Sequence, residues 1–105
     1  MKKIKLFVIS CLLGLNLVAQ NEASNWFFGE NAGLSFNLDT STIIQSFDGR
    51  LNTREGCSSI SDDAGNLLFY TDGLTVWNQN HTAMTNGFGL NGDSSSTQSA
   101  IIVPK

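Results

Sequence analysis

Residues 55–78, EGCSSISDDAGNLLFYTDGLTVWN, decide the fold class of this chain. The stretch contains three short β-forming segments, at residues 57–61, 67–71 and 74–78. Asp63-Ala64-Gly65-Asn66 supplies a turn between the first two segments. Asp72-Gly73 separates the second and third, and is typical of a two-residue hairpin, because both central residues of a type I′ turn need positive φ. The stretch predicts an antiparallel meander.

The same alternation of strand and turn continues toward the N-terminus. Trp26-Phe27-Phe28 is a short aromatic segment, and residues 30–33 form a turn signal. Leu34, Phe36 and Leu38 alternate with polar residues, which predicts a strand with one buried face. Residues 42–47 form a further β-branched run, which ends at a second hairpin signal, Asp48-Gly49.

The remaining segments are assigned by composition. Residues 51–56 have the composition of a loop, and residues 79–97 that of a long polar connection. Residues 99–103, SAIIV, predict a final strand. Residues 31–36 and 63–69 form a faint repeat, each a turn followed by an aromatic strand, as in propeller blades and sandwiches. No helical periodicity follows residue 19, so residues 20–105 are expected to be all-β.

Residues 1–19 have the organisation of a secretory signal peptide. Lys2, Lys3 and Lys5 precede an apolar run at residues 6–18, and Ala19 provides a small residue for cleavage. The run is shorter than the roughly 20 residues that span a membrane. We therefore expect two segments, a signal peptide at 1–19 and a β-rich region at 20–105, with export and no stable membrane insertion after cleavage.

The charge of residues 20–105 is strongly acidic. This part holds all nine acidic residues of the chain but only three of its six basic ones. Such a surface repels nucleic acid and anionic lipid, so neither is an expected partner. It also holds nine of the ten aromatic side chains, which predicts a thin, aromatic-rich core.

Residues 61–68 resemble an Asp-box, the Ser-x-Asp-x-Gly hairpin of sialidases and other propellers. Ser61, Asp63 and Gly65 match, whereas Leu68 stands where an aromatic residue is expected. In those families the box is a structural turn whose Asp accepts backbone N–H bonds, away from the active site. Even a true match would therefore favour a propeller rather than a hydrolase, and an ordinary Asp-Gly turn explains the residues at least as well.

No catalytic, cofactor-binding or metal-ligating residue is assigned from the sequence. The oxygen ligands Asp62, Asp63, Asn66 and Asp72 lack the spacing and closing Glu of a strong calcium loop, which leaves calcium binding there open. His81 is expected to be a polar loop residue rather than part of a zinc site, or of a nucleophile system with Cys57 or a serine.

Three further groups of residues have simple structural interpretations. Cys57 has no partner in residues 20–105 and is expected to be buried rather than reactive. Paired carboxylates for glycoside cleavage would have to come from Glu22, Glu30 and Glu55, which nothing in the sequence brings together. Aromatic stacking on sugars would have to come from Trp26, Tyr70 and Trp77, the last of which is expected in the core.

Five stretches of the chain together resemble one protein family. They are residues 25–34 (NWFFGENAGL), 55–57 (EGC), 65–73 (GNLLFYTDG), 76–78 (VWN) and 96–104 (STQSAIIVP). They are similar to the N-terminal region of large exported Bacteroidota proteins that end in a type IX secretion, gliding-motility-associated sorting domain, often after adhesion-type β-sandwich repeats. The resemblance implies a β-propeller-like region and assigns no catalytic residue. This chain contains neither the sorting domain nor the repeats.

Together these observations predict an all-β antiparallel meander, the first blades of a propeller-like region, in a secreted or cell-surface binding or adhesion protein without catalytic activity of its own. Surface glycans or proteins are the expected partners, and the type IX machinery only where a downstream sorting domain exists. The chain is expected to be an N-terminal piece of a longer protein, and residues 20–105 alone to fold poorly. The alternatives are part of a glycan-active propeller enzyme and a purely structural shielding domain.

Overall fold

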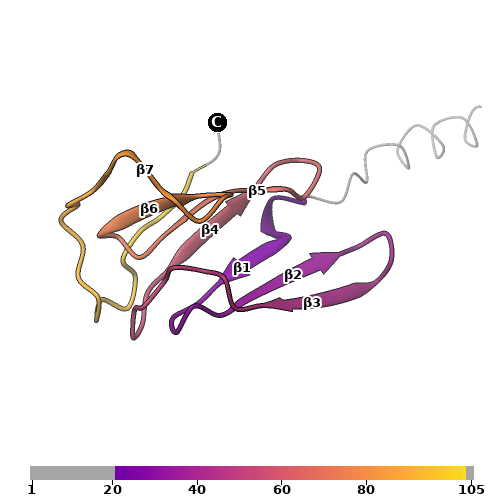
Figure 1. Ribbon diagram of the computed structural model, residues 1–105, viewed down its shortest axis with the longest axis horizontal. Helices are drawn as coiled ribbons and strands as arrows, with labels where there is room; N and C mark the ends of the chain where they lie inside the picture. Colours follow the sequence, from indigo (N-terminus) through magenta and orange to yellow (C-terminus); the bar gives the residue numbers. More distant parts are fainter. Residues whose placement is uncertain (1–20, 104–105) are drawn as a thin grey trace, which may run out of the picture.

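A computed structural model describes residues 21–103, which form two antiparallel sheets and almost no helix (Figure 1). A 3₁₀ turn, η1 (Asn21–Ala23), precedes the first sheet, β1 (Asn25–Phe27), β2 (Gly33–Asn37) and β3 (Thr42–Ser46). The second sheet comprises β4 (Ser58–Ser61), β5 (Leu67–Thr71), β6 (Thr75–Asn78) and β7 (Ala83–Phe88). Both sheets have their strands in sequence order, so the expected all-β meander is confirmed. The predicted signal peptide lies outside the described residues.

The strands with strong β composition form where they were predicted. β3 and β5 match the expected runs, and β5 begins and ends at the predicted residues. The two halves of the predicted repeat both lie in antiparallel hairpins, β1–β2 and β4–β5, but only the second has a register shift. No helix of residues 21–103 is long and apolar enough to cross a membrane.

Three predictions of secondary structure are wrong. The connection expected at 79–97 contains β7, which forms because a turn at Asn78–Thr82 places its backbone beside β6. Residues 99–103 are not a strand, because side chains tie the segment to β4: Ser58 Oγ donates to the carbonyl of Ala100 at 2.6 Å. Asp48-Gly49 makes no hairpin; the chain there crosses from β3 to β4 in the other sheet.

The tight turns also differ from expectation. Asp72 does not have positive φ, and Gly73 does (86°), so the β5–β6 connection is not a type I′ hairpin. Oδ1 of Asp72 instead accepts the N–H groups of Leu74 and Thr75, both at 2.9 Å. Two consecutive positive φ values occur in the β1–β2 turn, at Glu30 (58°) and Asn31 (63°).

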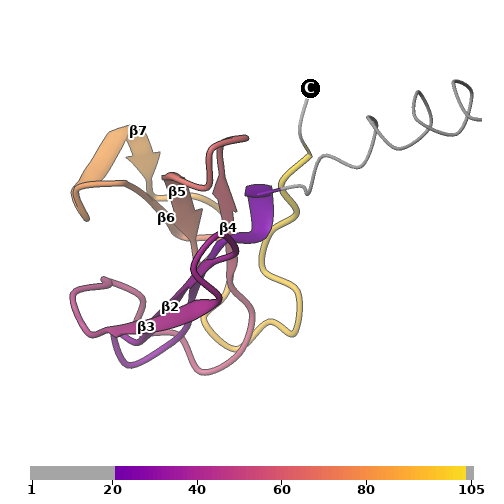
Figure 2. The ribbon, with the colours of Figure 1, turned by 90° about the vertical axis from the view of Figure 1, so that its right-hand side faces the viewer.

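The two sheets meet edge to face. Backbone bonds pair β1 with β2 at Phe28 and Ser24, so the intervening carbonyls of Asn25 and Phe27 point away from β2. These carbonyls accept hydrogen bonds from side chains in or just before β4: Ser59 Oγ donates to Asn25 at 2.7 Å, and Cys57 Sγ, one residue before the strand, donates to Phe27 at 3.1 Å. Figure 2 shows β4 beside the first sheet, with the C-terminal segment on its other side.

The core lies at this junction and is as thin as expected. Its buried apolar residues are Phe27, Leu51 and Tyr70, with Cys57, Leu67 and Trp77 packed around them. The Tyr70 ring stacks between Phe27 (centroids 4.4 Å apart) and Trp77 (5.6 Å). The predicted buried face of β2 is wrong: Leu34 and Phe36 are half-buried and Leu38 is exposed, because the first sheet joins the core through its edge.

Candidate ligand-binding cavity

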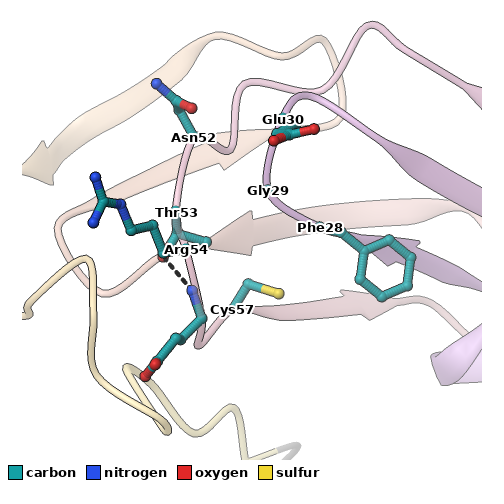
Figure 3. A pocket seen from close by; sticks show the side chains of 8 residues that line it. Phe28, Gly29, Glu30, Asn52, Thr53, Arg54 and Cys57 are labelled. Atoms are coloured by element: carbon teal, nitrogen blue, oxygen red, sulfur yellow. Dashed lines mark hydrogen bonds between the residues drawn. The ribbon is translucent and has the colours of Figure 1, made fainter.

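An open cavity lies between the β1–β2 turn and the segment that leads into β4. Its volume is about 800 Å³. The lining residues are Phe28, Gly29, Glu30, Asn52, Thr53, Arg54, Glu55 and Cys57 (Figure 3). In this view the thiol of Cys57 lies between the ring of Phe28 and the guanidinium of Arg54. The cavity therefore combines one aromatic ring with acidic, basic and amide groups.

Backbone contacts hold the two walls of the cavity together. A Cβ atom at Gly29 would overlap the carbonyl oxygen of Thr53, so only glycine allows this approach. The N–H of Asn31 donates to the carbonyl of Leu51 at 2.9 Å. On the far side, Thr53 Oγ1 and the N–H of Arg54 both donate to the carbonyl of Ser94, at 2.8 Å and 3.2 Å. The exposed side chains of Asn52, Arg54 and Glu55 thus project from a fixed backbone.

Cys57 is half-buried at the base of this cavity. Its thiol donates to the carbonyl of Phe27, and burial raises its pKa above the ordinary value of 9.0. A raised pKa disfavours the thiolate, the form that acts as a nucleophile. The expectation of a structural rather than reactive cysteine agrees with this environment.

His81 joins a chain of polar groups at the core. The Tyr70 hydroxyl accepts the N–H of Arg50 at 3.1 Å, and it shares a second hydrogen bond with Nδ1 of His81, 2.9 Å away. The other ring nitrogen of His81, Nε2, lies 3.3 Å from Oδ2 of Asp48. His81 lies in a loop, as expected, but its ring packs against Phe27 and Tyr70.

Asp48, His81 and Tyr70 are arranged in the acid–histidine–hydroxyl order of a nucleophilic catalytic triad. The hydroxyl, however, is not accessible to a substrate. Tyr70 is fully buried, and burial raises the pKa of its hydroxyl above the ordinary value of 10.0. A buried hydroxyl with a raised pKa is a poor nucleophile. These polar contacts instead link three segments that are distant in the sequence. The first contains Asp48 and Arg50, the second Tyr70 and the third His81.

The Asp-box assignment is wrong by one residue. The turn before β5 is held by Asp62, not Asp63: Oδ1 of Asp62 accepts the N–H groups of Ala64 (3.0 Å) and Asn66 (2.8 Å). The Asn66 side-chain amide donates to Oδ2 at 3.0 Å. These bonds lower the pKa of Asp62 below the ordinary 3.8. Gly65 supplies the positive φ of 86°.

The oxygen ligands considered for calcium do not form one group. Asp62, Asp63 and Asn66 precede β5, whereas Asp72 follows it, a separation of roughly 17 Å along a five-residue strand. The carboxylate of Asp72 is already used by its own turn. Within residues 21–103, no three His, Cys, Asp or Glu side chains are close enough to hold a metal ion.

The structure does bring together two acids that the sequence left apart. Glu30 and Glu55 both line the large cavity, whereas Glu22 belongs to η1 and lines other surface hollows. Of the aromatic residues considered for sugar stacking, Tyr70 is buried and Trp77 belongs to the core as expected. Trp26 is 47% exposed and contacts Phe28 and Phe36 edge to face.

Sequence reasoning missed Phe28, Asn52 and Arg54 as cavity residues. One signal was present: Arg54 is one of only three basic residues after residue 19, and it stands within a segment predicted to be a plain loop.

Comparisons of the chain with protein-family models, with curated proteins and with solved structures found no match.

Proposed function

We propose that this chain is a binding module of an exported cell-surface protein, and that the cavity beside Arg54 takes a glycan. The cavity itself supports this proposal: amide, carboxylate and guanidinium groups project from a backbone fixed on both sides. Such groups hydrogen-bond sugar hydroxyls, and the ring of Phe28 adds an apolar face at the rim. A preformed site of this kind suits adhesion, because little ordering is needed on binding.

Two finer features belong to the same proposal. The second sheet, β4-β5-β6-β7, has the strand number and sequential order of a propeller blade, which favours a propeller-like region. Export follows from the lysine-rich, apolar sequence of residues 1–19. Attachment through type IX secretion would require a downstream sorting domain.

A glycan array tests the binding function. We expect the wild-type chain to bind a subset of glycans, and Arg54→Ala to reduce that binding about tenfold or more, since a charge-assisted hydrogen bond contributes roughly 1.5–3 kcal/mol. Arg50→Ala is the matched control, because it removes the same charge from an exposed residue that does not line the cavity.

Two results would contradict the proposal. One is a wild-type chain that binds no glycan on the array. The other is an equal loss of binding in the Arg54 and Arg50 variants. That result would mean that glycan binding depends on the net charge of the protein and not on a contact of Arg54 in the cavity.

One observation favours a second candidate, a glycan-active enzyme: Glu30 and Glu55 line the same cavity. Glycosidases place two carboxyl groups on either side of the bond they cleave. Polysaccharide hydrolysis that both Glu30→Gln and Glu55→Gln abolish would favour this candidate over binding alone.

A further inference from the structure

Two of the four sheet edges are covered by other parts of the chain. On the β1 edge, the carbonyl of Asn25 accepts a hydrogen bond from Ser59 of β4, and that of Phe27 accepts one from Cys57, just before β4. Along the β4 edge, the N–H of Gly56 donates to Ser96 at 2.9 Å, and the side chain of Ser58 donates to Ala100. Covered edges of this kind do not pair with another chain.

The β7 edge is irregular rather than covered. Its register with β6 shifts between Thr75 and Trp77, and Asn86 within the strand has a φ of 58°. A bulged strand bends and breaks the even row of N–H and C=O groups that another strand would need.

The β3 edge is regular and open. The strand reads Thr-Ile-Ile-Gln-Ser, pairs with β2 without a register shift, and contains no charge and no proline. Ile43 is 64% exposed and Ile44 59%. Within the described part of the chain, β3 is neither covered by another segment, as β1 and β4 are, nor bulged, as β7 is.

The direction of the β3 backbone groups follows from the register. β2 bonds to β1 through Leu34 and Phe36, so Ser35 faces β3 and pairs with Ile44. Ile43 and Gln45 therefore direct their N–H and C=O groups outward. These four groups have no hydrogen-bond partner within residues 21–103.

We propose that β3 pairs with β3 of a second copy of this chain, antiparallel and centred on Ile44. A two-fold axis at Ile44 places Ile43 of each copy opposite Gln45 of the other, so all four outward groups form hydrogen bonds. Ile44 then faces Ile44 in a non-hydrogen-bonded pair, where side chains lie closest. Because the strand carries no charge, self-pairing brings no like charges together.

The pairing closes at two copies. Residues 21–103 of each molecule present one open edge, and a two-fold contact uses that edge on both partners, which leaves none for a third. A five-residue strand buries less surface than a permanent dimer needs, so we expect a reversible monomer–dimer equilibrium.

Sedimentation equilibrium over a concentration series tests the pairing. The wild-type full chain is expected to approach twice the monomer mass and no more. Ile43→Lys, which places an ammonium group on the open edge, is expected to weaken association about tenfold or more, because two cross-strand pairs are lost. Met84→Lys is the matched control on β7 and is expected to associate like wild type. Residues 1–20 are the same in all variants, so a difference in association between variants is due to the substituted strand.

Disulfide trapping tests the register. Ile44→Cys places two sulfur-bearing residues directly opposite, with Cα atoms about 4.5 Å apart, within disulfide range. We expect it to form a cross-linked dimer under mild oxidation. Gln45→Cys, about 7–8 Å from its counterpart, and the wild type with its native cysteines are expected not to. A wild type that stays monomeric, or equal association in the two lysine variants, would overturn the proposal and leave the edge to a strand of another protein.

Discussion

At the scale of single residues, Glu30 lies in a backbone conformation that is unfavourable for a glutamate side chain. Glu30 and Asn31 are the central pair of the β1–β2 turn, with φ of 58° and 63°. Asn tolerates the left-handed region, whereas a Glu side chain gains nothing from it. The turn persists because Gly29 packs on Thr53 and the N–H of Asn31 bonds to Leu51.

Glu30→Gly should therefore stabilise the fold. Glycine adopts positive φ without the steric cost, and we expect the free energy of unfolding to rise by about 1 kcal/mol. Urea denaturation measures the change. Glu30→Ala is the control, because it removes the same carboxylate and keeps the strain. Equal stability of the Gly and Ala variants would show that the backbone conformation at residue 30 costs nothing.

At the scale of elements, the hairpin between β4 and β5 is held by one carboxylate. Asp62 accepts three hydrogen bonds from Ala64 and Asn66, and Asp63 is its exposed neighbour in the same turn. The pKa of Asp62 is lowered in the folded protein, chiefly by the bonds to Asn66. Its stabilising effect is therefore present above the ordinary pKa of 3.8 and is lost as pH falls through the lower folded value.

We expect Asp62→Asn to destabilise the protein at neutral pH, with a difference from wild type that shrinks as the pH is lowered below 4. Thermal unfolding at a series of pH values measures this dependence. Asp63→Asn changes the same charge one residue away and should leave stability and its pH dependence almost unchanged. A pH-dependent loss for Asp63→Asn in place of Asp62→Asn would restore the original Asp-box assignment.

At the scale of the whole molecule, one leucine in a connecting segment links the two sheets. Leu51 is fully buried with Phe27 of β1 and Tyr70 of β5, although it belongs to no strand. Its carbonyl also accepts the N–H of Asn31 from the β1–β2 turn. With three buried apolar side chains in the core, each one carries a large share of the stability.

Leu51→Ala is expected to lower the free energy of unfolding by about 3 kcal/mol, the usual cost of emptying a buried leucine site. Leu38→Ala removes the same atoms from a side chain that is 56% exposed, and is expected to cost less than about 1 kcal/mol. Chemical denaturation of both variants measures their free energies of unfolding. The difference between them reports the burial of Leu51, because both variants lose the same atoms. Similar losses in the two variants would mean that Leu51 does not join the sheets.

The sequence by itself determined the class of fold and most of its strands. β3 and β5 combine β-branched or aromatic side chains with flanking turn residues, and such preferences act between near neighbours in the chain. The same local chemistry predicted the turn at residues 63–66, whereas Cys57, expected to be buried, is only half-buried. It also identified Trp77 as a core residue.

Only the tertiary structure decided the rest, because it depends on contacts between distant residues. β7 has weak β composition and is a strand through its pairing with β6, while SAIIV at 99–103 is not a strand because side chains bind it to β4. Burial of Leu51 and assembly of the cavity around Arg54 require the β1–β2 turn to meet a segment about twenty residues further along the chain. Hydrophobic burial is non-directional, so composition alone does not select which apolar residue becomes the core.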